Sequence, residues 1–343
     1  MKPQRILYIG PVSGTCLDRA NAFRRLGHDV THLDPRTLLP NSVWVDRILW
    51  RLGGHWLGWL VAMRMSKALT GQRFDLAYVD NGEWVSPAVV KVLRQHAPQV
   101  VNYNIDDPTG PRDMQRFAAY RRAVPHYDLV AVVREDNLPE LKALGAKRML
   151  RVWRSADEVT HAPRPLTPDD HARWDCDVLF LGTWMPERGP FLLDLVRRGV
   201  PLTIQGGNWQ KAPEWPELKA HWRGDQIGGD DYAKAIQCAK VNLGLLSKGN
   251  RDLHTTRSLE IPALGALFCA ERTSEHMAMY EDGVEAVFWS DAEECARACT
   301  ELLTDPARCQ AIAARGHARY LRNGHQNERI LDQLLIAAME QQA

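Results

Sequence analysis

The sequence predicts an α/β protein made of two Rossmann-like halves, each with a parallel sheet. Its 343 residues suit two domains, because domains usually contain about 100–200 residues. Short apolar runs alternate with helical patterns along both halves, and this alternation is typical of parallel sheets. A stretch without apolar periodicity separates the two alternating sets.

The first half, residues 1–155, opens with a strand at Arg5–Gly10, a polar loop and a helical pattern through Arg25. This order is the start of a Rossmann-like unit. Helices are expected at Ser86–His96 and Leu138–Leu144. Further strands are expected in Leu26–Leu33 and at Leu76–Asp80, Val100–Ile105, Leu129–Val133 and Met149–Val152.

Residues 156–175 are rich in Pro, Asp and His, and we expect them to form a linker. The second half, residues 176–321, has helical patterns at Pro190–Arg198 and Asp231–Ala239. The end of the chain, 291–343, is almost all helical, with breaks near Asp305-Pro306 and Asn323-Gly324. The strands expected in this half are Val178–Gly182, Leu202–Gln205, Val241–Leu245, Ala266–Cys269 and Ala286–Phe288.

The charge balance argues against nucleic acid as the main partner. The 43 basic and 42 acidic residues give a net charge of +1, whereas nucleic-acid binders usually carry a basic excess. The sequence has no run long enough for a signal peptide or a transmembrane helix, so we expect a cytoplasmic protein. The seven cysteines lack CxxC spacing and are read as free thiols.

One segment, Ile48–Met65, holds three tryptophans and few charges. A buried helix or helix pair is the favoured interpretation. A greasy acceptor wall or a peripheral membrane contact is the alternative, and the few charges count against an interfacial helix.

The stretch Arg251–Gly265 carries the clearest chemical pattern. A polar loop leads into a helix that Thr255 or Thr256 can cap and that ends at Gly265. A helix N-terminus offers free N–H groups to a diphosphate, and Arg257 can add a bidentate contact. The carboxylate of Glu260 can accept both hydroxyl protons of a ribose.

Several motifs resemble those of GT-B glycosyltransferases. Asp252 and Glu260, eight residues apart, are similar to the E-x7-E element with Asp in place of the first Glu. The run TRSLEIPALGA (256–266) resembles the T-R-x-F-E-I-P-A-x-G-G run of the CgeB/YkvP-like, spore-protein-like branch. Three further segments are similar to elements of that branch, in the same order: Asn104–Pro108, Val178–Thr183 with Arg188, and Ile204–Trp209.

The resemblance implies the GT-B fold, in which two domains face each other across a cleft and a C-terminal helix (about 322–343) returns to the first domain. It implies that Glu260 holds the ribose and that Arg188 and Arg257 clamp the diphosphate. Asp252 is implied near the donor sugar. Thr183, Gly206 and Trp209 are implied along the nucleotide. Three other interpretations stay open: a surface ion pair for Arg188, a solvated carboxylate for Glu260 and a core position for Trp209.

Other candidates come from loops that follow strands. Asp106 and Asp107 are the acid–base candidates, because adjacent carboxylates disfavour each other's ionisation; capping before Pro108 is the alternative. His254 is expected at phosphate or sugar, or else solvated, and Thr256 is expected beside it in the donor loop. Ser13, Gly14 and Asn81 are expected near the substrates, and Glu83 near the acceptor.

The sequence therefore predicts a glycosyltransferase that moves a sugar from a nucleotide-diphosphate sugar, with UDP as the expected nucleotide, to a surface glycan, a protein or a small molecule. No cofactor or metal is expected. A sugar-nucleotide epimerase and a non-catalytic binding protein on the same fold are the alternatives. An NAD oxidoreductase is disfavoured because the G-x-G-x-x-G fingerprint is missing. The sugar, the acceptor, the stereochemistry and the oligomeric state stay open.

Overall fold

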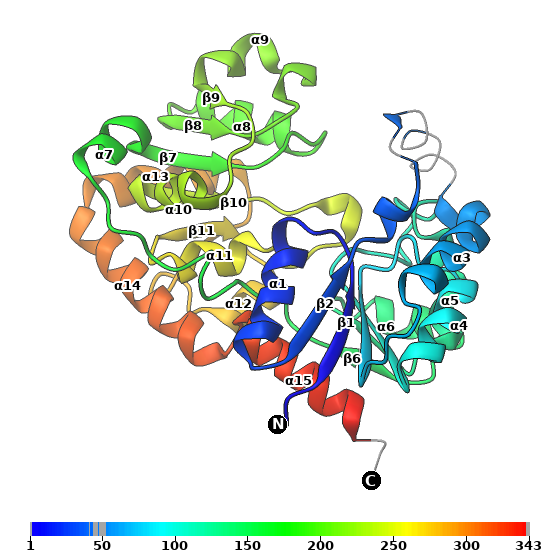
Figure 1. Ribbon diagram of the computed structural model, residues 1–343. Helices are drawn as coiled ribbons and strands as arrows, with labels where there is room; N and C mark the ends of the chain where they lie inside the picture. The colour runs from blue at the N-terminus through cyan, green and yellow to red at the C-terminus, as the bar shows by residue number, and fades with distance from the viewer. Residues whose placement is uncertain (1, 41, 44–46, 48–52, 341–343) are drawn as a thin grey trace. The chain divides into compact units, whose positions relative to one another are not determined.

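The computed structural model describes residues 2–40, 42–43, 47 and 53–340, and its chain divides into two compact units (Figure 1). The first unit comprises Met1–Arg154 and Asn327–Ala343, and the second comprises Ser155–Gln326. Each unit contains one six-stranded sheet whose neighbouring strands all run parallel. The predicted fold class is confirmed.

The first sheet has the strand order β2-β1-β3-β4-β5-β6. Its strands are β1 (Arg5–Ile9), β2 (Asp29–Leu33), β3 (Leu76–Asp80), β4 (Gln99–Asn104), β5 (Leu129–Val132) and β6 (Met149–Arg151). The central strand β3 is buried along its whole length, because helices cover both faces of a parallel sheet.

Two helical layers cover the first sheet. One face packs against α3 (Gly58–Ala68), α4 (Pro87–His96), α5 (Ala118–Ala123) and α6 (Asn137–Ala143). The other face packs against α1 (Gly14–Arg25) and the C-terminal helix α15 (Asn327–Met339), which lie side by side (Figure 1). The last helix of the chain thus belongs to the first unit.

The second sheet has the strand order β12-β11-β10-β7-β8-β9. Its strands are β7 (Cys176–Leu181), β8 (Leu202–Gln205), β9 (Trp222–Gly224), β10 (Ala239–Gly244), β11 (Phe268–Glu271) and β12 (Val287–Trp289). The edge strand β9 was not predicted, because its three residues contain no apolar run.

The helices of the second unit are α7 (Pro168–Trp174), α8 (Arg188–Arg197), α9 (Trp215–Leu218), α10 (Gly229–Cys238), α11 (Arg257–Ala263), α12 (Ser274–Met279), α13 (Ala292–Thr304) and α14 (Pro306–Asn323). Both predicted breaks in the C-terminal region are present. Asp305 caps α14 by accepting from the Arg308 N–H, and Pro306 occupies its first position. Gly324, with φ of 70°, ends it.

Residues 156–175, which we expected to form a linker, lie in the second unit and include α7. A capping box explains this helix: the Thr167 hydroxyl accepts from the Asp170 N–H, and the Asp170 carboxylate accepts from the Thr167 N–H. His161 of this segment is buried. The capping residues are short-range signals, whereas the burial depends on distant partners.

The tryptophan-rich segment is only partly described, since Ile48–Leu52 lie outside the described residues. The remainder forms the 3-10 turn η2 (Gly54–Leu57) and helix α3. Val61 and Met65 of α3 are buried, whereas Trp56 and Trp59 are exposed. The segment is therefore buried on one side only. Among the helices that the structure describes, none is long and apolar enough to cross a membrane.

Candidate functional site

Polar side chains gather at the carboxyl ends of the strands in each unit, where parallel sheets usually bind ligands. In the second unit a cavity of about 200 Å³ lies at the ends of β7 and β10, beside the start of α11. Its described lining carries two arginines and no carboxylate. The lining residues are Phe180, Leu181, Gly182, Thr183, Met185, Arg188, Leu245, Thr255, Thr256 and Arg257.

A second hollow, of about 270 Å³, shares Arg188 and Leu245 with this cavity. Phe191 and Trp289 line it and stack with ring centroids 4.6 Å apart. Lys248 also lines it and pairs with Glu271. The first hollow thus offers cationic groups, and the second offers aromatic groups together with the carboxylates of Glu187, Glu271 and Asp291.

Arg188 begins α8 and joins two strand ends. Its Nη1 donates to the carbonyl of Thr183 at 2.8 Å, and its Nη2 lies 3.4 Å from the carbonyls of Leu245 and Leu246. The guanidinium also lies over the Phe180 ring, 5.6 Å from its centroid. Arg188 is thus bound to the backbone of the cavity wall.

Gly206 and Trp209 support the cavity wall at Gly182 without lining the cavity themselves. Gly206 has φ of 148°, and a Cβ there would lie 2.2 Å from the Gly182 carbonyl oxygen, so only glycine fits. Trp209 is fully buried and donates from Nε1 to the same carbonyl at 2.9 Å. Its expected place along the nucleotide is corrected: the indole is a core residue that supports the Gly182 turn.

Arg257 and Glu260 form an ion pair at the start of α11. The Arg257 Nη1 donates to Glu260 Oε2 at 2.7 Å, and the Tyr232 hydroxyl donates to the same oxygen. His161 Nε2 lies 3.5 Å from Glu260 Oε1. Burial alone would raise the pKa of Glu260, but Arg257, His161 and the Tyr232 hydrogen bond together hold it below its usual value. Glu260 is therefore an enclosed carboxylate rather than a solvated one.

The predicted donor loop is more buried than its sequence suggests. Asp252 is buried, and its N–H donates to the Ser247 carbonyl at 3.4 Å. His254 is buried as well, and its Nδ1 pairs with Glu275 of α12. The solvated alternative for His254 is therefore wrong. Thr256 lines the cavity, and its hydroxyl accepts from Arg257 Nη1 at 3.3 Å.

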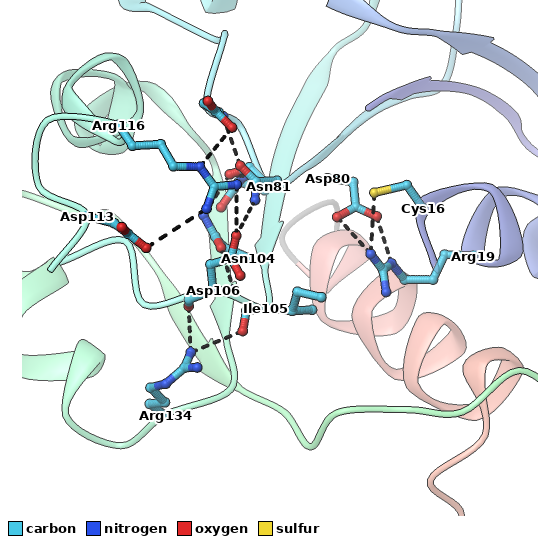
Figure 2. A network of polar contacts seen from close by, with 12 residues as sticks. Cys16, Arg19, Asp80, Asn81, Asn104, Ile105, Asp106, Asp113, Arg116 and Arg134 are labelled. Carbon is cyan, nitrogen blue, oxygen red and sulfur yellow. Dashed lines mark hydrogen bonds and ion pairs between the residues drawn. The ribbon is translucent and has the colours of Figure 1, made fainter. Parts of the chain in front are cut away.

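In the first unit the corresponding strand ends carry an acidic cluster around Arg116 (Figure 2). The Arg116 Nε donates to Glu83 Oε2 at 3.0 Å, and its Nη2 lies 3.3 Å from Asp106 Oδ2. Asn81 Nδ2 donates to the same Asp106 oxygen at 2.8 Å. Burial raises the pKa of Glu83, Arg116 offsets part of the rise, and the charges of Asp106 and Asp113 add to it.

Asp106 and Asp107 do not act as a pair. The Asp107 carboxylate is buried and accepts from Asn137 Nδ2 at 2.7 Å and from the Gly110 N–H at 3.1 Å. Asp106 instead faces Asn81 and Arg116. Asp107 therefore holds a turn at Gly110 and faces away from the partners of Asp106; no helix starts at Pro108 among the described residues, so this is not the helix cap of the alternative interpretation.

A cavity of about 90 Å³ adjoins this cluster, with Gly10, Asn81, Glu83, Trp84 and Arg116 on its lining. Asp80 lines it too. Arg19 donates to the Asp80 carboxylate from Nε at 2.7 Å and from Nη2 at 3.1 Å (Figure 2). The Tyr8 hydroxyl donates to the same carboxylate.

Ser13 and Gly14 are exposed at the start of α1 and are not on this lining. Sequence reasoning missed three partners of the predicted residues, Arg116, His161 and Tyr232, and it also missed the pair of Arg19 with Asp80. Each is distant in sequence from the residue that it contacts, so no local pattern marks it.

Residues 188–336 match the family model described as glycosyl transferase-like. A search of curated proteins returns no match.

Solved structures match over nearly the whole chain. Sucrose-phosphate synthase from Thermosynechococcus elongatus is 15% identical, with a TM-score of 0.69 and coverage of 98% of this chain and 100% of that one. HepE from Anabaena, in complex with UDP-glucose, is 13% identical, with a TM-score of 0.65 and coverage of 97% and 99%. The α,α-trehalose 6-phosphate synthase from Burkholderia multivorans is 11% identical, with a TM-score of 0.66 and coverage of 98% of each chain.

The two parallel six-stranded sheets match these GT-B structures across both units. The chain therefore has the GT-B fold, and its residues 188–336 match a glycosyl transferase-like family model.

Proposed function

We propose that this protein transfers a sugar from a nucleotide-diphosphate sugar, with UDP as its nucleotide, to a hydroxyl group of an acceptor. One observation carries the proposal: the cavity in the second unit presents Arg188 and Arg257 and no carboxylate on its described lining. Two fixed guanidinium groups suit a diphosphate, whose negative charge grows as the sugar leaves. The match of this region to a glycosyl transferase-like family supports the same function.

The donor contacts follow from the lining. Arg257, at the first position of α11, binds the diphosphate, and Arg188 fixes the loops around it. The hollow beside Phe191 and Trp289 has room and apolar surface for the nucleobase. HepE, a protein of the same fold, is described in complex with UDP-glucose, and this favours UDP.

We propose a role for Glu260 that differs from the expected ribose contact. Its carboxylate is enclosed by Arg257, Tyr232 and His161 and is only 3% exposed. Glu260 would therefore hold Arg257 in position and act on the donor through that guanidinium. Asp252 and His254 are buried and do not line the proposed donor cavity, so their proposed place near the donor sugar stays a prediction; Glu275 pairs with His254.

The first unit would bind the acceptor, and Glu83 is the base that we propose. Burial raises the pKa of Glu83, and a carboxylate with a raised pKa is a stronger base. Glu83 accepts the hydroxyl proton, the acceptor oxygen forms a bond to the anomeric carbon, and the bond from that carbon to the diphosphate oxygen breaks. The nucleoside diphosphate leaves with both electrons of that bond. Asp106 is the second candidate, since it shares Arg116 with Glu83.

We propose that the reaction needs no metal ion, because Arg188 and Arg257 supply positive charge where the diphosphate would bind. Turnover should then be unchanged by EDTA. That the chain belongs to the CgeB/YkvP-like branch of the glycosyltransferases also stays a prediction, which the order of the motifs around TRSLEIPALGA supports.

A thermal-shift panel of UDP, GDP, dTDP and CMP sugars tests the donor proposal. A UDP sugar should raise the Tm, because a ligand at 100 times its Kd stabilises the folded state by about 2.7 kcal/mol. Arg197→Gln, which alters an exposed arginine of the same unit, is the control and should keep the shift. Stabilisation by none of these sugars would overturn the proposal. Release of free UDP that requires an acceptor would exclude an epimerase.

A further inference from the structure

The described chain exposes two tryptophans to a large extent, and they lie together. Trp56 on η2 is 70% exposed and Trp59 on α3 is 65% exposed. Met63, four residues further along α3, is 56% exposed. Spacings of three and four residues place side chains on one side of a helix. The result is an apolar stripe on the outer surface of the helical layer.

Three of the four helices of that layer, α3, α4 and α5, carry basic residues and no acidic ones, whereas α6 contains Glu140. Helices α3, α4 and α5 contain no Asp or Glu in their sequences, and each contains two arginines or lysines. These are Arg64, Lys67, Lys91, Arg94, Arg121 and Arg122. Helix α4 contacts both α3 and α5, and η2 contacts the same two helices, so the charges share one layer (Figure 1).

This concentration of charge is unusual in a chain whose net charge is only +1. Arg94 is neutralised by Asp128 at 2.6 Å. Lys67, Lys91 and Arg122 are exposed. Arg122 also lies close enough to His55, the neighbour of Trp56, for its charge to lower the pKa of that imidazole, together with the larger effect of burial. Basic and apolar groups are therefore adjacent.

We propose that this face, defined by Trp56, Trp59, Met63, Lys67, Lys91 and Arg122, binds the surface of a membrane that contains anionic lipids. Tryptophan is favoured at the boundary between water and acyl chains, because its ring is apolar and its N–H is polar. Lysine and arginine beside it attract anionic headgroups. Single-stranded nucleic-acid sites also combine basic residues with exposed aromatic rings, so binding to DNA is the rival outcome of the test.

The face continues to the cavity of the first unit. The backbone of Gly54, two residues before Trp56, packs so closely on the Trp84 ring that a Cβ would lie 2.7 Å from it. Trp84 in turn lines the cavity beside Glu83. A membrane bound to this face would lie near the place proposed for the acceptor. Membrane binding itself requires no sugar nucleotide, so this proposal stands or falls separately from the proposed function.

Co-sedimentation of the full chain with lipid vesicles tests the proposal. We expect binding to phosphatidylcholine vesicles that contain phosphatidylglycerol, and much weaker binding to phosphatidylcholine alone. Lys67→Gln/Arg122→Gln should weaken the partition by about 30-fold, since each basic residue contributes roughly fivefold. Trp56→Ser/Trp59→Ser should weaken it by at least tenfold, on the order of burying two aromatic rings.

Matched variants on the opposite helical layer serve as controls. Ile336→Ser on α15 removes an exposed apolar side chain, and Arg24→Gln/Arg329→Gln removes two exposed charges. Both should bind vesicles as the unmodified chain does. Thermal melts check that every variant is folded. Failure of the unmodified chain to bind anionic vesicles overturns the proposal, as does an equal loss in the controls or tighter binding to DNA than to vesicles.

Discussion

The carboxyl edges of the two sheets differ in charge, although the sheets have the same number of parallel strands. The cavity of the first unit is lined by Asp80 and Glu83 with one arginine. The cavity of the second is lined by Arg188 and Arg257. The charged side chains on the two cavity linings are thus mainly acidic in the first unit and basic in the second. Under the proposed function, an anionic diphosphate suits the second cavity and a neutral hydroxyl compound suits the first. Each prediction below removes one charge from this contrast.

The largest effect is expected for Glu83→Gln. If Glu83 is the base, turnover of a stabilising donor should fall by a factor on the order of 10²–10³, with donor affinity unchanged. In the unmodified enzyme the rate should fall as the pH falls through the raised pKa of Glu83, because the base must be deprotonated. The variant should lose this acidic limb in a pH–rate profile.

Two neighbouring variants sharpen that result. Asp106→Asn removes a charge that raises the pKa of Glu83, so the acidic limb should move to lower pH. Asp107→Asn alters the buried turn at Asn137 and Gly110, so it should lower the Tm and leave the limb in place. Full activity of Glu83→Gln, with Asp106→Asn inactive, would transfer the base role to Asp106.

A smaller effect is expected for Arg257→Gln. Loss of a charge-assisted hydrogen bond costs about 1.5–3 kcal/mol, which corresponds to a 10- to 100-fold weaker affinity for UDP. Calorimetry measures it, with Arg197→Gln as the surface control. An unchanged affinity for UDP would show that Arg257 does not bind the diphosphate.

The smallest effect is expected for Glu260→Gln, which loosens Arg257 without removing it. Affinity for UDP and for inorganic pyrophosphate should both fall several-fold. If the affinity falls for UDP but not for pyrophosphate, Glu260 contacts the ribose after all, because pyrophosphate has no ribose.

Stability gives an independent measurement on Glu260. Its pKa is lower in the folded state than the usual 4.5, so its contribution is present above that pH and is lost as the pH falls through the folded value. Glu260→Gln should therefore reduce the free energy of unfolding at pH 7 by about 1–3 kcal/mol and have less effect in acid. Urea unfolding at several pH values measures both.

The sequence allowed most of the fold to be predicted because the signals for it are local. Apolar runs marked eleven of the twelve strands, and Asp305-Pro306 and Gly324 marked the ends of the last helices. The strand β9 carried no such signal. The segment 156–175 looked like a linker because its composition says nothing of the distant residues that bury His161.

The candidate sites were less accessible to prediction. A motif placed Arg257 and Glu260 on one short helix, but not the enclosure of Glu260 by Tyr232 and His161. Adjacent carboxylates suggested a coupled pair, yet Asp106 and Asp107 have different partners. Coupling between carboxylates lies instead between Glu83 and Asp106, which follow different strands and meet only when β3 and β4 pair.

The indole of Trp209 has a use beyond packing. It is hydrogen-bonded to the Gly182 carbonyl, and the Trp222 indole is bonded to the Gly206 carbonyl. Indole emission depends on the polarity and hydrogen bonding around the ring. The turns at Gly182 and Gly206 beside the proposed donor cavity are each hydrogen-bonded to a tryptophan ring. A change in either turn should therefore change tryptophan emission, which can be measured without a dye or a labelled substrate.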